Sequence, residues 1–76
     1  MVDEREWHIQ RNSLQHGTQF LHISGYDSLR FDWIARPEHS SRFTQREAAL
    51  FCITNNQIMA AANAEHEARF NMLRAR

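Results

Sequence analysis

The side chains that could support acid–base or metal chemistry are few and scattered along the sequence. The 76 residues contain five histidines and a single cysteine, Cys52. Protein zinc sites use three or four ligands, and their cysteines and histidines usually recur at short spacings. No such spacing occurs in this chain, so the sequence predicts neither a metal site nor a bound cofactor. We interpret the histidines as surface residues.

The candidates for nucleophilic catalysis are equally isolated. Cys52 lies in the most apolar stretch of the chain, where a thiol usually packs as a small hydrophobic group with a raised pKa. Ser40 and Ser41 lie beside His39, but adjacent residues on a loop do not by themselves form a catalytic relay. Two glycines are too few for a Gly-rich phosphate loop. We therefore predict that the protein is not an enzyme and has no catalytic residues.

Arginines and aromatic residues are better suited to binding a partner. All nine basic residues are arginine, and Arg36, Arg42 and Arg46 cluster around a polar loop and the start of a helix. They could hold a phosphate or a partner carboxylate, and a solvated face balanced by glutamates is the alternative. Tyr26, in a turn, and Trp7, in the core or at an edge, are the aromatic candidates. These five residues are the predicted partner-binding residues.

The overall charge restricts the classes of molecule that the protein is expected to bind. The nine arginines balance nine acidic residues, so the formal net charge is zero. Strongly electrostatic nucleic-acid binders are usually basic overall, which makes nucleic acid an unfavoured partner. No apolar run approaches the roughly 20 residues of a membrane span, and the charged N-terminus lacks a signal-peptide core. We expect a cytoplasmic protein that does not enter a membrane.

Three short segments within residues 6–35 alternate apolar and polar side chains, as half-buried strands do. The segments are residues 7–9, 20–24 and 29–33. In the third, Leu29, Phe31 and Trp33 should face the core while the charged residues between them face solvent. Pro37 lacks the N–H donor that a strand needs, so the sheet should end before it. The sequence predicts a three-stranded antiparallel sheet.

A helix is predicted to start at Thr44. Residues 44–47, Thr-Gln-Arg-Glu, match the capping box, in which each end residue satisfies a backbone N–H of the other. The helix that follows is apolar on nearly all sides over residues 48–53, so a sheet on one side cannot cover it. The polar residues 54–56 interrupt this apolar stretch. The helical segment is expected to occupy residues 44–75.

Two arrangements of that segment are compatible with the sequence. One helix from Gln45 to Arg74 would be about 45 Å long and would project from the domain. It would repeat at heptad spacing from Cys52 to Leu73 and would need a dimer or another partner. Alternatively, the chain turns at residues 55–56 and a second helix folds back as the cover. The expected fold is a single α+β domain, with one long or two shorter C-terminal helices after the sheet.

The run from Trp33 to Cys52 combines a strand ending in tryptophan, a step of residues 40–43 that ends in phenylalanine, and a capped helix that begins Glu-Ala. This combination resembles small accessory proteins of tailed phages and prophages, in which the step usually begins with alanine rather than Ser40. The resemblance implies a protein that occupies a surface of a host or bacterial-immunity protein, as anti-CRISPR proteins do. No functional residue is carried over, because the group has no shared functional motif.

Three functions follow from these observations. The leading hypothesis is a non-catalytic, phage-encoded inhibitor that blocks a host or CRISPR-Cas protein by covering its surface. The second is a small nucleic-acid-binding regulator that uses the arginine cluster. The third is a homodimeric structural component joined through the C-terminal helix.

Overall fold

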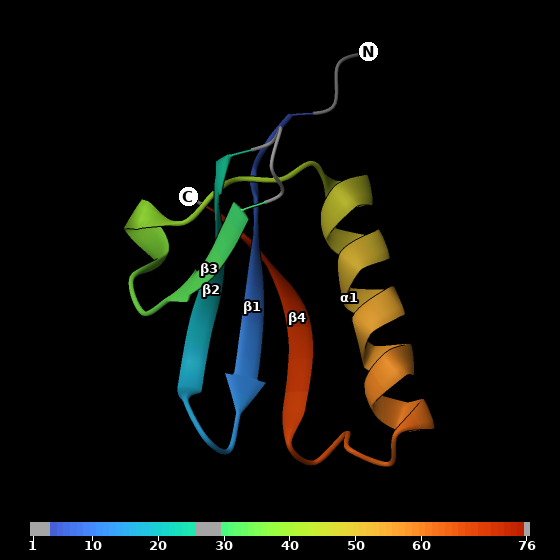
Figure 1. Ribbon diagram of the computed structural model, residues 1–76. Coiled ribbons are helices and arrows are strands. Elements are labelled where there is room, and N and C mark those ends of the chain that lie inside the picture. The colour runs from blue at the N-terminus through green and yellow to red at the C-terminus, as the bar shows by residue number, and fades with distance from the viewer. Residues whose placement is uncertain (1–3, 26–29, 76) are drawn as a thin grey trace.

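The protein folds as an antiparallel sheet with one α-helix packed on one face (Figure 1). The computed structural model describes residues 4–25 and 30–75. Its elements are the strands β1 (Trp7–Ser13), β2 (Gly17–Gly25) and β3 (Arg30–Ile34), the 3₁₀ turn η1 (Pro37–His39), the helix α1 (Gln45–Ala61) and the strand β4 (Ala68–Arg74). The strand order is β3-β2-β1-β4. The predicted α+β class, the three N-terminal strands and the antiparallel pairing are confirmed.

The predicted C-terminal helical segment is wrong, because its last part is a fourth strand. Strand β4 pairs with β1 along its whole length, with Ile9 opposite Met72 and Arg11 opposite Phe70. The segment is rich in alanine, arginine, methionine and leucine, which favour helices when no other element intervenes. Pairing with β1 overrides that weak preference and puts Phe70 and Met72 against the core. The sheet therefore has four strands instead of three.

The helix does not break at residues 55–56, and it does not continue to the C-terminus. It ends at Ala61, where Asn63 adopts a left-handed φ of 56°. The Ala64 N–H then donates to the Met59 carbonyl at 2.8 Å, which closes the helix in a Schellman motif. Neither the projecting helix with heptad spacing nor the pair of helices is formed. Within the described ranges, no helix is long and apolar enough to cross a membrane.

Asn56 is a polar residue of the helix that acts on the edge of the sheet. Its Nδ2 donates to the Phe70 carbonyl at 2.8 Å, and the Phe70 N–H donates to its Oδ1 at 2.9 Å. The side-chain amide thus replaces a neighbouring strand at the middle of β4. Exposed strand edges pair readily with other chains, so this contact also protects the edge. The interruption in the apolar pattern of the helix is explained by this contact, not by a turn.

The residues before the helix are inserted into the sheet. Strands β1 and β2 pair only in the halves next to their connecting turn, and beyond that point the chain of residues 41–43 lies between them. Phe43 exchanges two backbone hydrogen bonds with Trp7, at 2.8 and 3.0 Å. On the other side, the Ile23 N–H donates to the Ser41 hydroxyl at 2.7 Å. This insertion buries Phe43 and sets the place where the helix begins.

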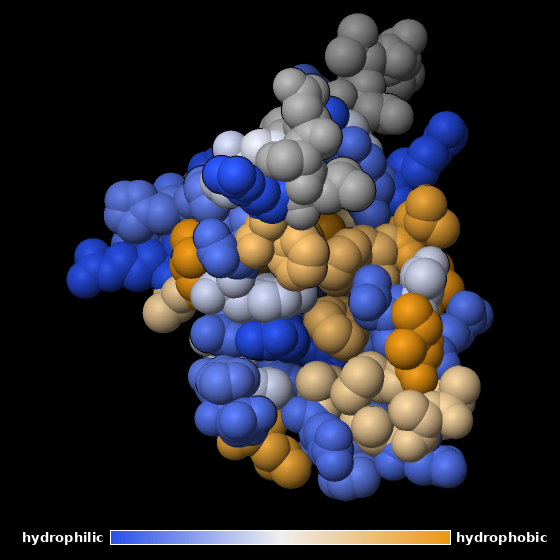
Figure 2. Space-filling view, in the orientation of Figure 1, coloured by the Kyte–Doolittle hydropathy of each residue, from blue (hydrophilic) through white to orange (hydrophobic). Residues whose placement is uncertain are grey.

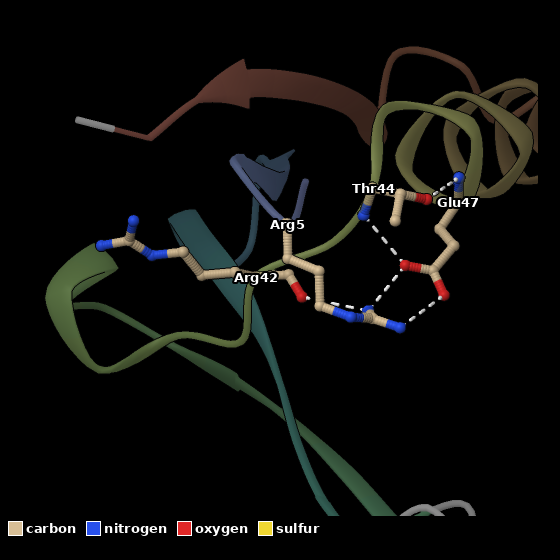
Figure 3. A network of polar contacts seen from close by, with 4 residues as sticks. All are labelled: Arg5, Arg42, Thr44 and Glu47. Carbon is tan, nitrogen blue, oxygen red and sulfur yellow. Dashed lines mark hydrogen bonds and ion pairs between the residues drawn. The ribbon is translucent and has the colours of Figure 1, made fainter. Parts of the chain in front are cut away.

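The predicted capping box is present and extends into a larger network (Figure 3). The Glu47 N–H donates to the Thr44 hydroxyl at 3.1 Å, and the Thr44 N–H donates to the Glu47 carboxylate at 2.9 Å. Arg5 also donates to the same carboxylate through two nitrogens, at 2.7 and 3.4 Å. The backbone bond from Thr44, followed by the charge of Arg5, lowers the pKa of Glu47. The network ties the N-terminal segment to the start of the helix.

We predict that Asn56→Ala destabilises the protein, because it leaves the Phe70 N–H and carbonyl without their partner. The expected loss is about 1–3 kcal/mol in the free energy of unfolding, measured by urea denaturation. The matched control is Asn55→Ala, whose side chain bonds only to the Phe51 carbonyl inside the helix, at 2.8 Å. That control should change stability by less than about 0.5 kcal/mol. Equal effects of the two substitutions would contradict the role assigned to Asn56.

The Glu47 network predicts a pH dependence of stability. Because the folded-state pKa of Glu47 lies below the unfolded value of about 4.3, its stabilisation is complete above that pH. It disappears as the pH falls through the lower, folded-state pKa. The difference in urea midpoint between the wild type and Glu47→Gln should therefore shrink between about pH 5 and pH 3. A difference that stays constant over this range would show that the charge of Glu47 contributes nothing.

Candidate functional site

The most distinctive surface feature is an apolar groove between the helix and the far half of the sheet. Helix α1 packs over β1 and β4, so the part of the same sheet face that belongs to β2 and β3 is not under the helix. The groove has a volume of about 370 Å³. It is lined by Ile9, Leu21, Ile23, Phe31, Phe43, Glu47 and Phe51. Figure 2 shows apolar side chains gathered on this side of the molecule, with hydrophilic side chains below them.

The floor and the walls of the groove differ in exposure. Ile9, Leu21 and Phe43 form the floor and are buried in the main core cluster. Phe31 forms an outer wall and is 59% exposed. Phe31 lies on the side of β3 that faces the core layer, as predicted, but the helix does not cover it, so its side chain stays exposed. Leu29 lies outside the described residues.

The helix carries further exposed apolar side chains outside the groove. Ala48 and Cys52 face the sheet and are buried, whereas Leu50 is 64% and Ile53 57% exposed. Leu50 is one position before Phe51, which lines the groove. The prediction that a sheet on one side cannot cover this helix is confirmed. Within residues 4–25 and 30–75, no element covers its outer apolar side chains.

Glu47 is the charged residue in the lining of the groove. Its carboxylate is held by the Thr44 backbone and by Arg5, which leaves it ionised and largely neutralised by an ion pair. Both side chains are about half exposed, so this pair adds little to stability. The remaining lining residues carry no nucleophile and no titratable group. The groove is thus suited to binding an apolar group, and it has no arrangement for acid–base chemistry.

An aromatic cluster of Trp33, Phe51 and Phe70 shares one member, Phe51, with the lining of the groove. The Trp33 ring lies 6.1 Å from the Phe51 ring and 5.8 Å from the Phe70 ring, measured between centroids. The Phe51 and Phe70 rings are 5.9 Å apart in an edge-to-face arrangement. Aromatic pairs at such separations are favourable beyond their burial. The guanidinium carbon of Arg11 lies 4.6 Å from the Trp33 ring centroid, so a cation covers the outer side of this cluster.

The three arginines of the predicted cluster make different contacts. Arg36 pairs with Glu38 at 4.0 Å, on the 3₁₀ turn. The Arg42 side chain points away from the helix start, and only its carbonyl contacts Arg5 (Figure 3). Arg46 is exposed in the first turn of the helix. Phosphate binding by these arginines stays a prediction.

The two aromatic candidates have different positions. Trp7 is half-buried against the core and bonds to the inserted segment through its backbone. Tyr26 lies outside the described residues. Their roles in partner binding stay predictions. The sequence did not predict the residues that line the groove. Phe43, an apolar residue directly before the N-cap Thr44, was a signal that pointed to one of them.

The structure places Cys52 and His8 in buried positions. Cys52 is 6% exposed, and burial raises the pKa of its thiol. His8 is buried on the opposite face of the sheet, where its Nδ1 lies 2.7 Å from the Ser40 hydroxyl. Burial and, secondarily, the charge of Arg42 lower the pKa of His8. Among the described residues, no group of three or more His, Cys, Asp or Glu side chains could hold a metal ion.

Comparison with protein-family models, with curated proteins and with solved structures finds no match for this chain.

We predict that the Cys52 thiol is unreactive in the folded protein. A thiol reagent at about pH 8 should modify the native chain at least about tenfold more slowly than the urea-unfolded chain, because reaction requires an exposed thiolate. The reaction is followed by absorbance or mass spectrometry. Equal rates in the two states would show that Cys52 is accessible and would contradict its place in the core.

Proposed function

We propose that this protein is a non-catalytic binding protein. Its partner is a protein that inserts an apolar side chain into the groove between α1, β2 and β3. The observation that supports this proposal best is the apolar lining of the groove, together with the exposed apolar side chains Leu50 and Ile53 on the helix. Exposed apolar surfaces of this kind usually mark interaction sites. The groove brings three phenylalanines to that surface, and large aromatic side chains often dominate binding energy at protein interfaces.

The chemistry of the groove favours protein over nucleic acid as its occupant. The walls are apolar, and the charged lining residue, Glu47, is already paired with Arg5, so the lining offers no cation to a phosphate. The net charge of zero provides no general attraction to nucleic acid. These properties disfavour nucleic acid at this surface.

The extent of the apolar surface favours a protein over a small molecule. Small ligands are usually enclosed over most of their surface, whereas Leu50 and Ile53 extend the apolar area onto an open helix face. A protein partner could cover the groove and the helix face together. From the resemblance described above, we propose a host or bacterial-immunity protein as that partner, with inhibition resulting from coverage of its surface.

The proposal predicts that a groove substitution abolishes capture of a specific partner. The immobilised wild type, Phe31→Arg and a control are exposed to bacterial lysate, and bound proteins are quantified by mass spectrometry. The control is Leu14→Arg, because Leu14 is 78% exposed and lies in the turn between β1 and β2, outside the groove. A true partner should bind Phe31→Arg at least about tenfold more weakly and the control as well as the wild type.

Two outcomes would contradict the proposal. One is a partner that binds wild type and Phe31→Arg equally, which would place its contact elsewhere. The other is capture of no partner together with no effect on growth or immunity when the protein is expressed in bacteria. Because Phe31 is more than half exposed, its replacement is expected to leave the fold intact, and a thermal melt checks this.

A further inference from the structure

Arg11 is an unusual residue to find on the helix-facing side of the sheet. In the register it lies between two other residues on that side, Phe70 in β4 and Gln19 in β2. Its guanidinium donates to the Gln19 side-chain oxygen and stacks on the Trp33 ring, with 4.6 Å from the guanidinium carbon to the ring centroid. The side chain therefore crosses β2 and ends beside β3 over Trp33, whose ring lies 6.1 Å from the ring of the groove residue Phe51, measured between centroids.

The charge of Arg11 has no anionic partner in the part of the chain that the structure describes. None of the ion pairs among residues 4–25 and 30–75 includes it. Its Nε atom is buried and makes no hydrogen bond there. Burial lowers the pKa of Arg11, but a guanidinium remains protonated in proteins. A half-buried cation without a counterion is costly, and the Trp33 ring offsets only part of that cost.

The charges in and beside the groove are therefore unequal. At the helix end, the Glu47 carboxylate is already paired with Arg5 at 2.7 Å. Beside the groove, over the Trp33 ring, the Arg11 guanidinium keeps N–H donors that bond to no other described residue. Arg11 follows Ile9 of the groove floor by two residues, which places both on the same face of β1, and its guanidinium then reaches across β2 to the Trp33 ring.

We propose that the partner's docking segment carries an aspartate or glutamate that pairs with Arg11, next to the apolar side chain that enters the groove. This inference rests on the proposed function, because it specifies the chemistry of that same partner. The planar guanidinium suits a carboxylate, which can accept two parallel hydrogen bonds from it. A docking segment that places an acidic side chain over Trp33 and an apolar side chain in the groove makes both contacts. The apolar groove alone does not discriminate between apolar side chains. Pairing with Arg11 therefore favours partner segments that also carry an acidic residue.

The test uses a displayed library of short random peptides, selected separately on the wild type, on Arg11→Gln and on Ile23→Arg. Ile23→Arg places a cation in the groove and should abolish enrichment. The wild type should enrich peptides in which an acidic residue accompanies a large apolar one. Arg11→Gln should enrich apolar peptides without the acidic residue. Circular dichroism melts verify that each variant is folded.

A second measurement requires no protein variant. The best wild-type peptide is compared with its Glu→Gln or Asp→Asn version by fluorescence titration. The acidic peptide should bind the wild type at least about tenfold more tightly than its amide version. Against Arg11→Gln, the two peptides should bind alike. This comparison remains decisive if Arg11→Gln does not fold, because the wild-type arm alone measures the preference for the carboxylate.

The possible failures are distinguishable. Groove-dependent enrichment of apolar peptides without an acidic preference would overturn the role of Arg11 and leave the proposed function standing. No enrichment, or enrichment unaffected by Ile23→Arg, would overturn both. A wild-type chain that is dimeric by sedimentation equilibrium and becomes monomeric on Ile23→Arg would identify a second copy as the occupant and would also overturn the proposal.

Discussion

The insertion of residues 41–43 between β1 and β2 is the contact on which the rest of the structure depends. The backbone of Phe43 pairs with Trp7 of β1, and Ser41 satisfies the Ile23 N–H of β2. Both strand halves would otherwise leave their backbone groups without partners where they separate. The same insertion drives the Phe43 ring into the core and begins the helix at the next residue. One short segment therefore completes the sheet, contributes to the core and positions the helix.

The position of the helix determines what remains exposed. Because α1 packs over β1 and β4, the inner side of β2 and β3 becomes the wall of a groove instead of core. Ordinary packing would leave such a surface polar, yet here it carries Ile23 and Phe31. The charges in and beside the groove differ, since Glu47 is paired within the chain while Arg11 is stacked on an aromatic ring without an anion in the described ranges. The apolar groove is the physical basis of the proposed function, and the Arg11 guanidinium over Trp33 is the basis of the further inference.

Local sequence patterns predicted the elements that local physics determines. The alternation around Ile9 and Trp33 gave the first and third strands, and the residues from Thr44 to Glu47 identified the start of the helix, because a capping box is a contact between residues three apart. The end of the helix was also encoded locally, in Asn63, but the left-handed conformation of one asparagine is a weak signal. The candidate site was not predicted, since its lining residues come from three strands, a loop and a helix.

The sequence by itself determined the α+β class, the antiparallel strands before Pro37, the capped helix and the fact that one sheet face cannot cover that helix. Only the tertiary structure decided that Ala68–Arg74 is a strand, because its pairing with β1 and the Asn56 side-chain bonds to Phe70 outweigh a small intrinsic preference for helix. The tertiary structure also decided which side of the helix is covered. Strands β1 and β4 cover one side, and the described residues leave the other side exposed. That outcome depends on contacts between residues far apart in the chain, which no local pattern specifies.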